Sequence, residues 1–530
     1  MARTNTSRTT SGLNAYSGNW GEAEILHLLK RVHFGVRIED VNYFKTKTLN
    51  QTIAEILTID YAPPAPPINN YNDANNDPVI APGQTWVGNF NSLLNGVRMA
   101  SFKRWWTGEL INHDRTVREK LVMFWHNHFA TQTDVYNWPN YAYDYTALLR
   151  ANASKNFKTL TKLVTLDAAM LVYLNGDRNT KVAPDENYSR ELQELFTLGK
   201  GPNSNYTESD VIEGAKILTG WRINRSTGAV YFDATKHDTA NKTFSSFYDN
   251  TTINGQTGAK GAEELDDLLD MIFNQEEVSK HFARKLYRWF VYYDIDETTE
   301  ENVILPLAAI LRSNNYEVKP VLEALFKSEH FFDTANRGAL LKSPVDFTVG
   351  LCRIFDIQFP NTDYVLKYDL WNIINYAAAI QQQDIGDPPS VAGWPAYYQI
   401  PLFHEIWINS DTLPNRNKIS DVLITYGYTV RGTKLTINVL DYAAKFSSVA
   451  YPVAFIDEIL PHLHTLEVSQ DQKDYMRSIL LSGQVEDHYW TDAWNLHKND
   501  PNNTTYQTVV GLRLVQLIQY LMNLAEFQLS

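Results

Sequence analysis

Two histidines one residue apart are the first side chains in this sequence that could bind a metal ion or move a proton. His126 and His128 lie in the motif WHNHF, which closes a helical pattern beginning near Val117. If the helix continues through the motif, the two imidazoles point about 200° apart and cannot share one ion. If it ends near Trp125, both could face the same way. Because no Gly or Pro stop follows directly, the separated arrangement is favoured, with one histidine contributing and the other bonded to a carboxylate.

A pair of carboxylates supplies the second candidate group. Glu191 and Glu194 are three residues apart in RELQEL, where a predicted helix would place them on one face, with Arg190 beside them. Such a pair is most often a solvated helix face. Carboxylates and imidazoles from separate helices also build metal sites, and this oxygen and nitrogen ligation suits zinc, manganese or iron. The structural alternative is a set of His–Glu and Arg–Glu hydrogen bonds that lock two helices together.

The third group is HDTANK, a polar segment where His237, Asp238 and Lys242 lie close in sequence. Asp238 could orient the His237 ring or act as a ligand, and Lys242 could hold an anion. The alternative is a loop tied down by Asp turns. Trp221, in TGW, would line a pocket or belong to the core.

These groups together form the predicted site. The expected catalytic residues are His126, His128, Glu191, Glu194, His237 and Asp238; the expected ligands of a divalent zinc, manganese or iron ion are His126, His128, Glu191, Glu194 and His237; the expected substrate-binding residues are Arg190, Trp221 and Lys242.

The elements that must position these residues are mainly helices. Apolar residues recur every three to four positions along most of the chain, which is typical of amphipathic helices. Thr207, followed by two acids in the next three positions, predicts a helix N-cap. The segment 221–233 predicts a hairpin turning at 226–228. The sequence therefore predicts a mostly α, large multi-helix globular assembly with a small β-hairpin insertion at 221–250.

Three regions are expected along the chain. Residues 1–20 are predicted to be a flexible N-terminal segment, and 21–350 a helical core that carries the motifs. Residues 351–530 form a C-terminal helical lobe, either as a separate unit or as part of one continuous domain. The Pro- and Asn-rich stretch 61–83 is expected to be a long surface loop, since its prolines exclude a continuous helix. The stretch 411–447 fits helix or strand.

Charge and cysteine content exclude some classes of function. The 530 residues include 61 acids and 47 bases, and the net charge of −14 argues against a non-specific nucleic-acid binder. The single cysteine, Cys352, excludes an intrachain disulfide and a cysteine-based zinc site. No apolar signal segment precedes the first helical pattern, and no run reaches the roughly 18 apolar residues of a membrane span. We expect a soluble protein, and a removed export signal is equally compatible with the sequence.

Six motifs in a fixed order carry a resemblance to a known family. They are FWHNHFAT (124–131), NYSRELQELFTLGKG (187–201), YTESDVIEGAKILTGW (206–221), HDTANKTF (237–244), PPSVAGWP (388–395) and the ending LMNLAEFQLS. From about Ala23 to its end the chain resembles the bacterial family called domain of unknown function 1800, which has no settled activity. The resemblance implies export to the periplasm, cell surface or medium, and a sulfatase-like partner from the family called domain of unknown function 1501. The ending is similar to forms from the Bacteroidota.

Two functional hypotheses follow. The first is an enzyme with a metal- or His/carboxylate-dependent site that acts on an envelope or extracellular polymer. The second is a non-catalytic scaffold or binding partner of the sulfatase-like protein, in which the same motifs pack helix junctions. Convergence of the motifs on one cleft reachable by solvent favours the enzyme, whereas motifs that lie apart or are sealed by aromatic rings favour the scaffold.

Overall fold

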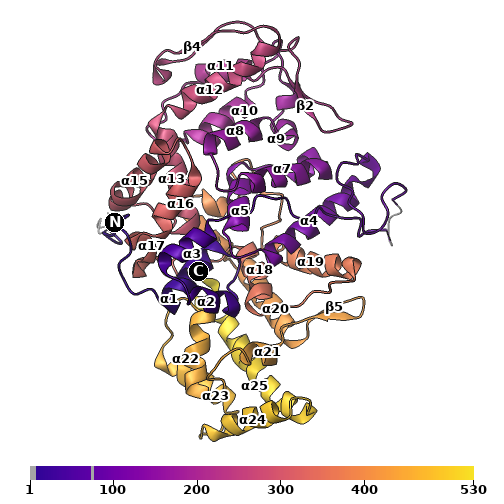
Figure 1. Ribbon diagram of the computed structural model, residues 1–530, viewed down its shortest axis with the longest axis vertical. Coiled ribbons are helices and arrows are strands. Elements are labelled where there is room, and N and C mark those ends of the chain that lie inside the picture. Colours follow the sequence, from indigo (N-terminus) through magenta and orange to yellow (C-terminus); the bar gives the residue numbers. More distant parts are fainter. Residues whose placement is uncertain (1–6, 73–76) are drawn as a thin grey trace.

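The computed structural model describes residues 7–72 and 77–530 (Figure 1). The helices before residue 180 are α1 (Glu22–Val32), α2 (Ile38–Phe44), α3 (Leu49–Ile56), α4 (Asn95–Asn112), α5 (Arg118–His128), α6 (Thr133–Tyr136), α7 (Pro139–Ala151), α8 (Phe157–Thr165) and α9 (Ala168–Tyr173). Those up to residue 340 are α10 (Asn187–Glu191), the π-helical η3 (Leu192–Thr197), α11 (Glu208–Ile217), α12 (Glu264–Phe273), α13 (Glu276–Phe290), α14 (Glu297–Thr299), α15 (Leu305–Ser313), α16 (Val318–Phe326) and α17 (Glu329–Phe332). The remainder are α18 (Pro344–Ile354), α19 (Tyr364–Ala379), α20 (Thr412–Thr425), α21 (Val439–Ala443), α22 (Pro452–Leu463), α23 (Gln470–Leu480), α24 (His488–Asn499) and α25 (Thr504–Asn523). The predicted mostly α fold is confirmed.

Helix starts follow local sequence signals. The predicted N-cap is confirmed: the Thr207 hydroxyl accepts the Asp210 N–H, and the Asp210 carboxylate in turn accepts the Thr207 N–H at 2.7 Å. The same reciprocal arrangement joins Ser343 and Asp346 at the start of α18, where Pro344 fills a first-turn position that needs no N–H donor.

Strands occur only as short antiparallel hairpins in the described residues. The predicted hairpin is confirmed, since β1 (Trp221–Ile223) pairs with β2 (Val230–Phe232) so that Trp221 lies opposite Phe232. A separate hairpin joins β3 (Lys242–Thr243) to β4 (Thr252–Ile253). In the stretch 411–447 both structures occur, because α20 is followed by β5 (Tyr428–Val430) and β6 (Thr433–Leu435).

The helices α4, α5 and α18 lie in the middle of the molecule. Figure 1 shows α22 to α25 at one end, and α11 and α12 with β2 and β4 at the other. The helix α4 packs against α7, α18 and α19, while α25 packs against α20, α21, α23 and α24. Buried apolar side chains from Ile25 through Phe527 form one connected core. One apolar core therefore extends from the first helix to the last described residues.

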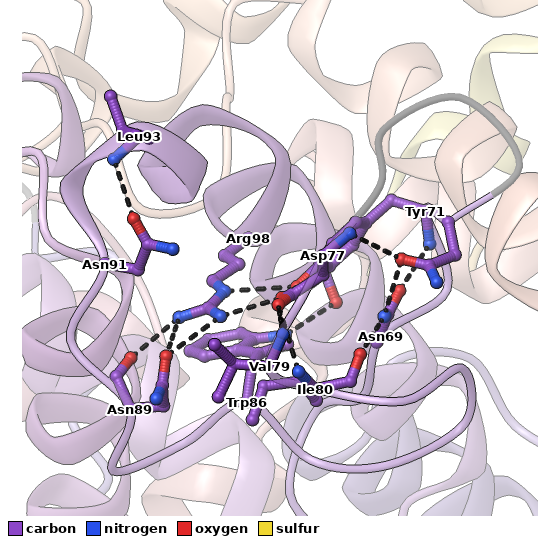
Figure 2. A network of polar contacts seen from close by, with 12 residues as sticks. Asn69, Tyr71, Asp77, Val79, Ile80, Trp86, Asn89, Asn91, Leu93 and Arg98 are labelled. Carbon is purple, nitrogen blue, oxygen red and sulfur yellow. Dashed lines mark hydrogen bonds and ion pairs between the residues drawn. The ribbon is translucent and has the colours of Figure 1, made fainter.

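A buried ion pair anchors the long Pro- and Asn-rich loop to α4 (Figure 2). The Arg98 guanidinium donates to Asp77 at 2.8 Å, and neither side chain is exposed. The other Asp77 oxygen accepts the main-chain N–H groups of Val79 and Ile80, each at 3.0 Å. Arg98 also donates to the Asn89 carbonyl at 2.7 Å. Arg98 also donates through Nε to the Tyr71 hydroxyl at 3.1 Å, so the described residues on both sides of 73–76 are fixed to the helical body. Residues 73–76 of the expected loop lie outside the described part.

Both ends of the described chain pair with distant segments. Of the N-terminal stretch expected to be flexible, residues 1–6 lie outside the described part, and Arg8 donates to the Ala335 carbonyl at 2.6 Å. Near the other end, the Lys342 N–H donates to the Gln528 carbonyl and the Ser530 N–H donates to the Leu340 carbonyl, both at 2.8 Å. The segment before α18 thus forms a short antiparallel contact with residues 528–530.

Candidate functional site

The helix α5 continues through the WHNHF motif to His128. The two histidines consequently lie in different surroundings. The His126 ring packs edge-on against Trp106 of α4, with 5.1 Å between ring centroids, and lies 5.8 Å from Trp394. The Nε2–H of His128 donates to the main-chain carbonyl of Phe196 in η3 at 3.1 Å. Of the two geometries compatible with the sequence, the structure has the one in which the rings point apart.

Aromatic side chains seal both imidazoles. His126 and His128 are each 1% exposed, and the Nδ1 atom of each has no hydrogen-bond partner among the described residues. Burial lowers the pKa of His126 to about 4 and the pKa of His128 well below its ordinary value. The His128 ring packs among side chains of α5, α8 and α13 and of the segment after α5: Phe124, Phe129, Phe157 and Phe282. Both rings are therefore neutral near pH 7 and shielded from solvent.

The polar contact that the motif makes with a distant loop comes from its central residue. Asn127 accepts the main-chain N–H of Trp394 through Oδ1 at 2.9 Å. The preceding residue, Gly393, has φ +91°, and a Cβ there would lie 2.3 Å from the same oxygen. Asn127 thus docks the segment PPSVAGWP onto α5. Sequence reasoning missed this residue, because nothing local to either motif indicates that the two segments meet.

The paired glutamates lie where the helix changes its winding. The α-helix α10 ends at Glu191, and Glu194 falls in the π-helical η3, so the regular spacing expected of the pair is absent. Glu194 pairs with Lys200. One carboxylate oxygen of Glu191 is buried and has no hydrogen-bond partner among the described residues, and burial raises the pKa of Glu191. Arg190 faces away and binds Glu208 at 2.7 Å, on the surface. His128 reaches η3 through the carbonyl of Phe196 rather than through either glutamate.

The HDTANK segment closes a buried ionic cluster around a residue that the sequence analysis did not single out. Glu264, the first residue of α12, accepts His237 Nε2–H at 3.0 Å through one oxygen and Lys242 Nζ at 2.6 Å through the other. His237 is 1% exposed, and Lys242 and Glu264 are fully buried. Burial raises the pKa of Glu264, but the hydrogen bonds from His237 and Lys242 outweigh it and lower that pKa below its usual value. The cluster joins the second hairpin to α12.

Asp238 and Trp221 have structural partners of their own. The Asp238 carboxylate accepts the Ala240 N–H at 2.8 Å in a tight turn, and Glu264 rather than Asp238 contacts the His237 ring. Trp221 packs edge-on against Phe232 across the first hairpin, with centroids 5.1 Å apart. Glu264 was hard to find from sequence because it lies in the acid-rich run GAEELDD, where a single carboxylate does not stand out.

The predicted site residues therefore occupy separate places rather than one cleft. His126 lies between α4 and the Trp394 loop, His128 faces η3 and α13, and His237 belongs to the Glu264 cluster. Among residues 7–72 and 77–530, no three His, Cys, Asp or Glu side chains are grouped so that they could hold a metal ion. The described helices also include none that is both long and apolar enough to span a bilayer.

Comparison with known proteins identifies one family. The model described as "Protein of unknown function (DUF1800)" matches residues 27–529. No match was found among the curated proteins or among the solved structures.

Proposed function

The chain belongs to the DUF1800 family, and from the packing of its motifs we propose that it is a non-catalytic scaffold that binds another protein. The proposed partner is the sulfatase-like protein that the family resemblance implies. The resemblance also supports a bacterial, Bacteroidota-like origin and export, so that the complex would form outside the cytoplasm.

The observation that carries the proposal is the burial of the three motif histidines. His126, His128 and His237 are each 1% exposed, and each is held in a different packing junction. A general acid or base must come within hydrogen-bond reach of its substrate, either directly or through one water. Sealed imidazoles that join helices to loops instead fit the second role expected of these motifs, which is to fix a rigid surface for a partner.

The alternative, a metal- or His/carboxylate-dependent enzyme acting on an envelope polymer, is tested by elemental analysis. The protein should be purified without an affinity metal, as wild type and as His126→Ala/Glu191→Ala. The scaffold proposal expects no stoichiometric zinc, manganese or iron in either protein, and a lower melting temperature for the variant, because truncating His126 leaves a cavity beside Trp106. Near-stoichiometric metal in the wild type, absent from a variant that still folds, would contradict the scaffold proposal and support the enzyme hypothesis.

The partner is tested directly with purified proteins. The full chain should co-elute with the sulfatase-like protein in size-exclusion chromatography, with a light-scattering mass equal to the sum of the two. Both proteins should be loaded at tens of micromolar, so that a complex with a dissociation constant of about 10 μM or tighter is detected. Separate elution at this concentration would contradict the partner assignment. Export is checked by locating the native protein in cell fractions.

A further inference from the structure

Two adjoining cavities lie away from the three motif histidines. The first, about 30 Å³, is lined from α1, α5, α13, α18 and the segment 396–407. The second, about 20 Å³, lies beside it and shares three lining residues with it: Lys30, Asp346 and Ser530. Since one water needs roughly 10–15 Å³ in this measure, the first cavity has room for a small group and not for a sugar ring.

The side chains around these cavities are strongly basic in a chain of net charge −14. Five cationic side chains line one or both cavities: Lys30, Arg31, Lys120, Arg288 and Lys342. Asp346 is the only acidic side chain among the described lining residues, and it is already bound by Lys120 and by the Ser343 hydroxyl. Asp346 is thus the one acidic side chain that the described lining residues set against these five basic groups.

Arg31 has two guanidinium nitrogens that bind nothing among the described residues. Arg31 is 2% exposed, and its Nη2 donates to the Asn336 carbonyl at 2.6 Å. Its Nε and Nη1 are buried and have no partner among the described residues. A guanidinium has N–H donors and no acceptor, so each of these two nitrogens can donate to an oxygen of a bound anion.

Two further groups on the wall of the first cavity, Arg288 and His404, have nitrogen atoms without a hydrogen-bond partner among the described residues. Arg288 donates through Nε to the Tyr293 carbonyl at 3.2 Å, and within the described residues it forms no ion pair. The Nδ1 atom of His404, which is 9% exposed, has no partner in the described part of the chain. Polar groups buried in this way are normally hydrogen-bonded, so the unused donors indicate a ligand that supplies acceptors.

We infer that the first cavity binds a tetrahedral oxyanion, sulfate or phosphate, between Arg31 and Arg288. The anion is either free or the end group of a larger molecule whose body stays outside. Donors arrive from α1, α5 and α13, which suits an anion whose oxygens point in several directions better than a planar carboxylate. Burial lowers the pKa of Arg31 to about 9 and of Lys342 to about 7, and the Asp346 carboxylate only partly opposes this.

Equilibrium dialysis of the full-length protein with radiolabelled sulfate and phosphate tests the inference. We expect saturable binding of about one anion per chain and a loss of roughly tenfold or more in affinity in Arg31→Gln. Arg288→Gln should weaken binding similarly, and because this residue is only half-buried, it decides the matter should Arg31→Gln fail to fold. Arg312→Gln, at a surface arginine bound to Glu276, is the matched control and should leave binding unchanged.

Three outcomes would overturn the inference: no saturable binding at millimolar anion, equal binding by wild type and both cavity variants, or acetate binding as tightly as sulfate. Comparing inorganic sulfate and phosphate with a sugar sulfate and a sugar phosphate separates the two sources of the anion. Direct binding is measured because sulfate stabilises most proteins without a specific site, so a rise in melting temperature alone is not evidence. This result is independent of whether the chain binds the proposed protein partner.

Discussion

Asn127 and Trp394, 267 residues apart, are joined by a hydrogen bond from the Trp394 main-chain N–H to the Asn127 Oδ1 atom, at 2.9 Å. The contact places a loop of the C-terminal half against a central helix of the N-terminal half. The Trp394 side chain is fully buried and lies beside the His126 ring. Asn127 therefore makes the polar contact with the Trp394 loop, and His126 packs against the Trp394 ring.

Replacing Asn127 by Ala should lower the free energy of unfolding by about 1–3 kcal/mol, because the buried Trp394 N–H loses its acceptor. Urea denaturation measures the effect. The control is Asn314→Ala at an exposed position, where the asparagine side chain donates to the Ile310 carbonyl and the Ser313 hydroxyl on the same helix. This change should cost less than about 0.5 kcal/mol. Equal effects of the two substitutions would mean that the loop does not depend on Asn127.

Gly393→Ala should be more destabilising than Gly88→Ala. Both glycines have positive φ, +91° and +83°, so a side chain costs about 1–2 kcal/mol of backbone energy at either position. Only at Gly393 does the added Cβ also meet the Asn127 carboxamide, at 2.3 Å, whereas nothing lies within 4 Å at Gly88. Thermal unfolding of the two variants isolates the steric contribution, and identical melting temperatures would contradict it.

Lys242→Met should cost about 3–5 kcal/mol, since it leaves the Glu264 carboxylate buried without its closest cation. Lys158→Met is the matched control, because Lys158 forms an exposed ion pair with Asp270, which lies on α12 as Glu264 does. A pair of that kind contributes about 1 kcal/mol or less. Chemical denaturation of both variants tests the difference. If Lys242→Met were as mild as the control, the cluster would not hold the hairpin to α12.

The burial of His126 makes stability fall in acid. In the unfolded chain the ring takes up a proton near pH 6.5, but in the folded chain only near pH 4. The unfolded state thus binds more protons between these values, so the stability present above pH 6.5 is lost as the pH falls through 4. His126→Leu should remove about 3 kcal/mol of this loss between pH 7 and pH 3. Urea denaturation across that range measures it, and parallel curves for wild type and variant would rule it out.

Local signals in the sequence predicted the local structure. The Thr207 cap, the hairpin at 221–233 and the helical spacing before His126 each depend on residues a few positions apart, and the structure confirms them. The stretch 411–447 fitted either structure because its apolar runs are short, and it contains both a helix and a hairpin.

The candidate site depended on contacts that local patterns do not encode. Glu264 completes the His237 cluster from 27 residues away, and Phe196 meets His128 across 68 residues. The π-helical winding after Glu191 also removes the regular α-helical spacing that would place Glu191 and Glu194 on one face. Residue types indicated which side chains could do chemistry, whereas tertiary packing decides which of them remain available.

The antiparallel contact between residues 340–342 and 528–530 has a consequence for the order in which the molecule is built. Lys30, Asp346 and Ser530 line the same two cavities, so part of that wall is supplied by the first helix and part by the end of the sequence. During synthesis, the surface of α1 that carries Lys30 stays uncovered until residues 528–530 have left the ribosome. Since contacts between such distant segments close late in folding, the basic cavities form late, after residues 340–342 and 528–530 have paired.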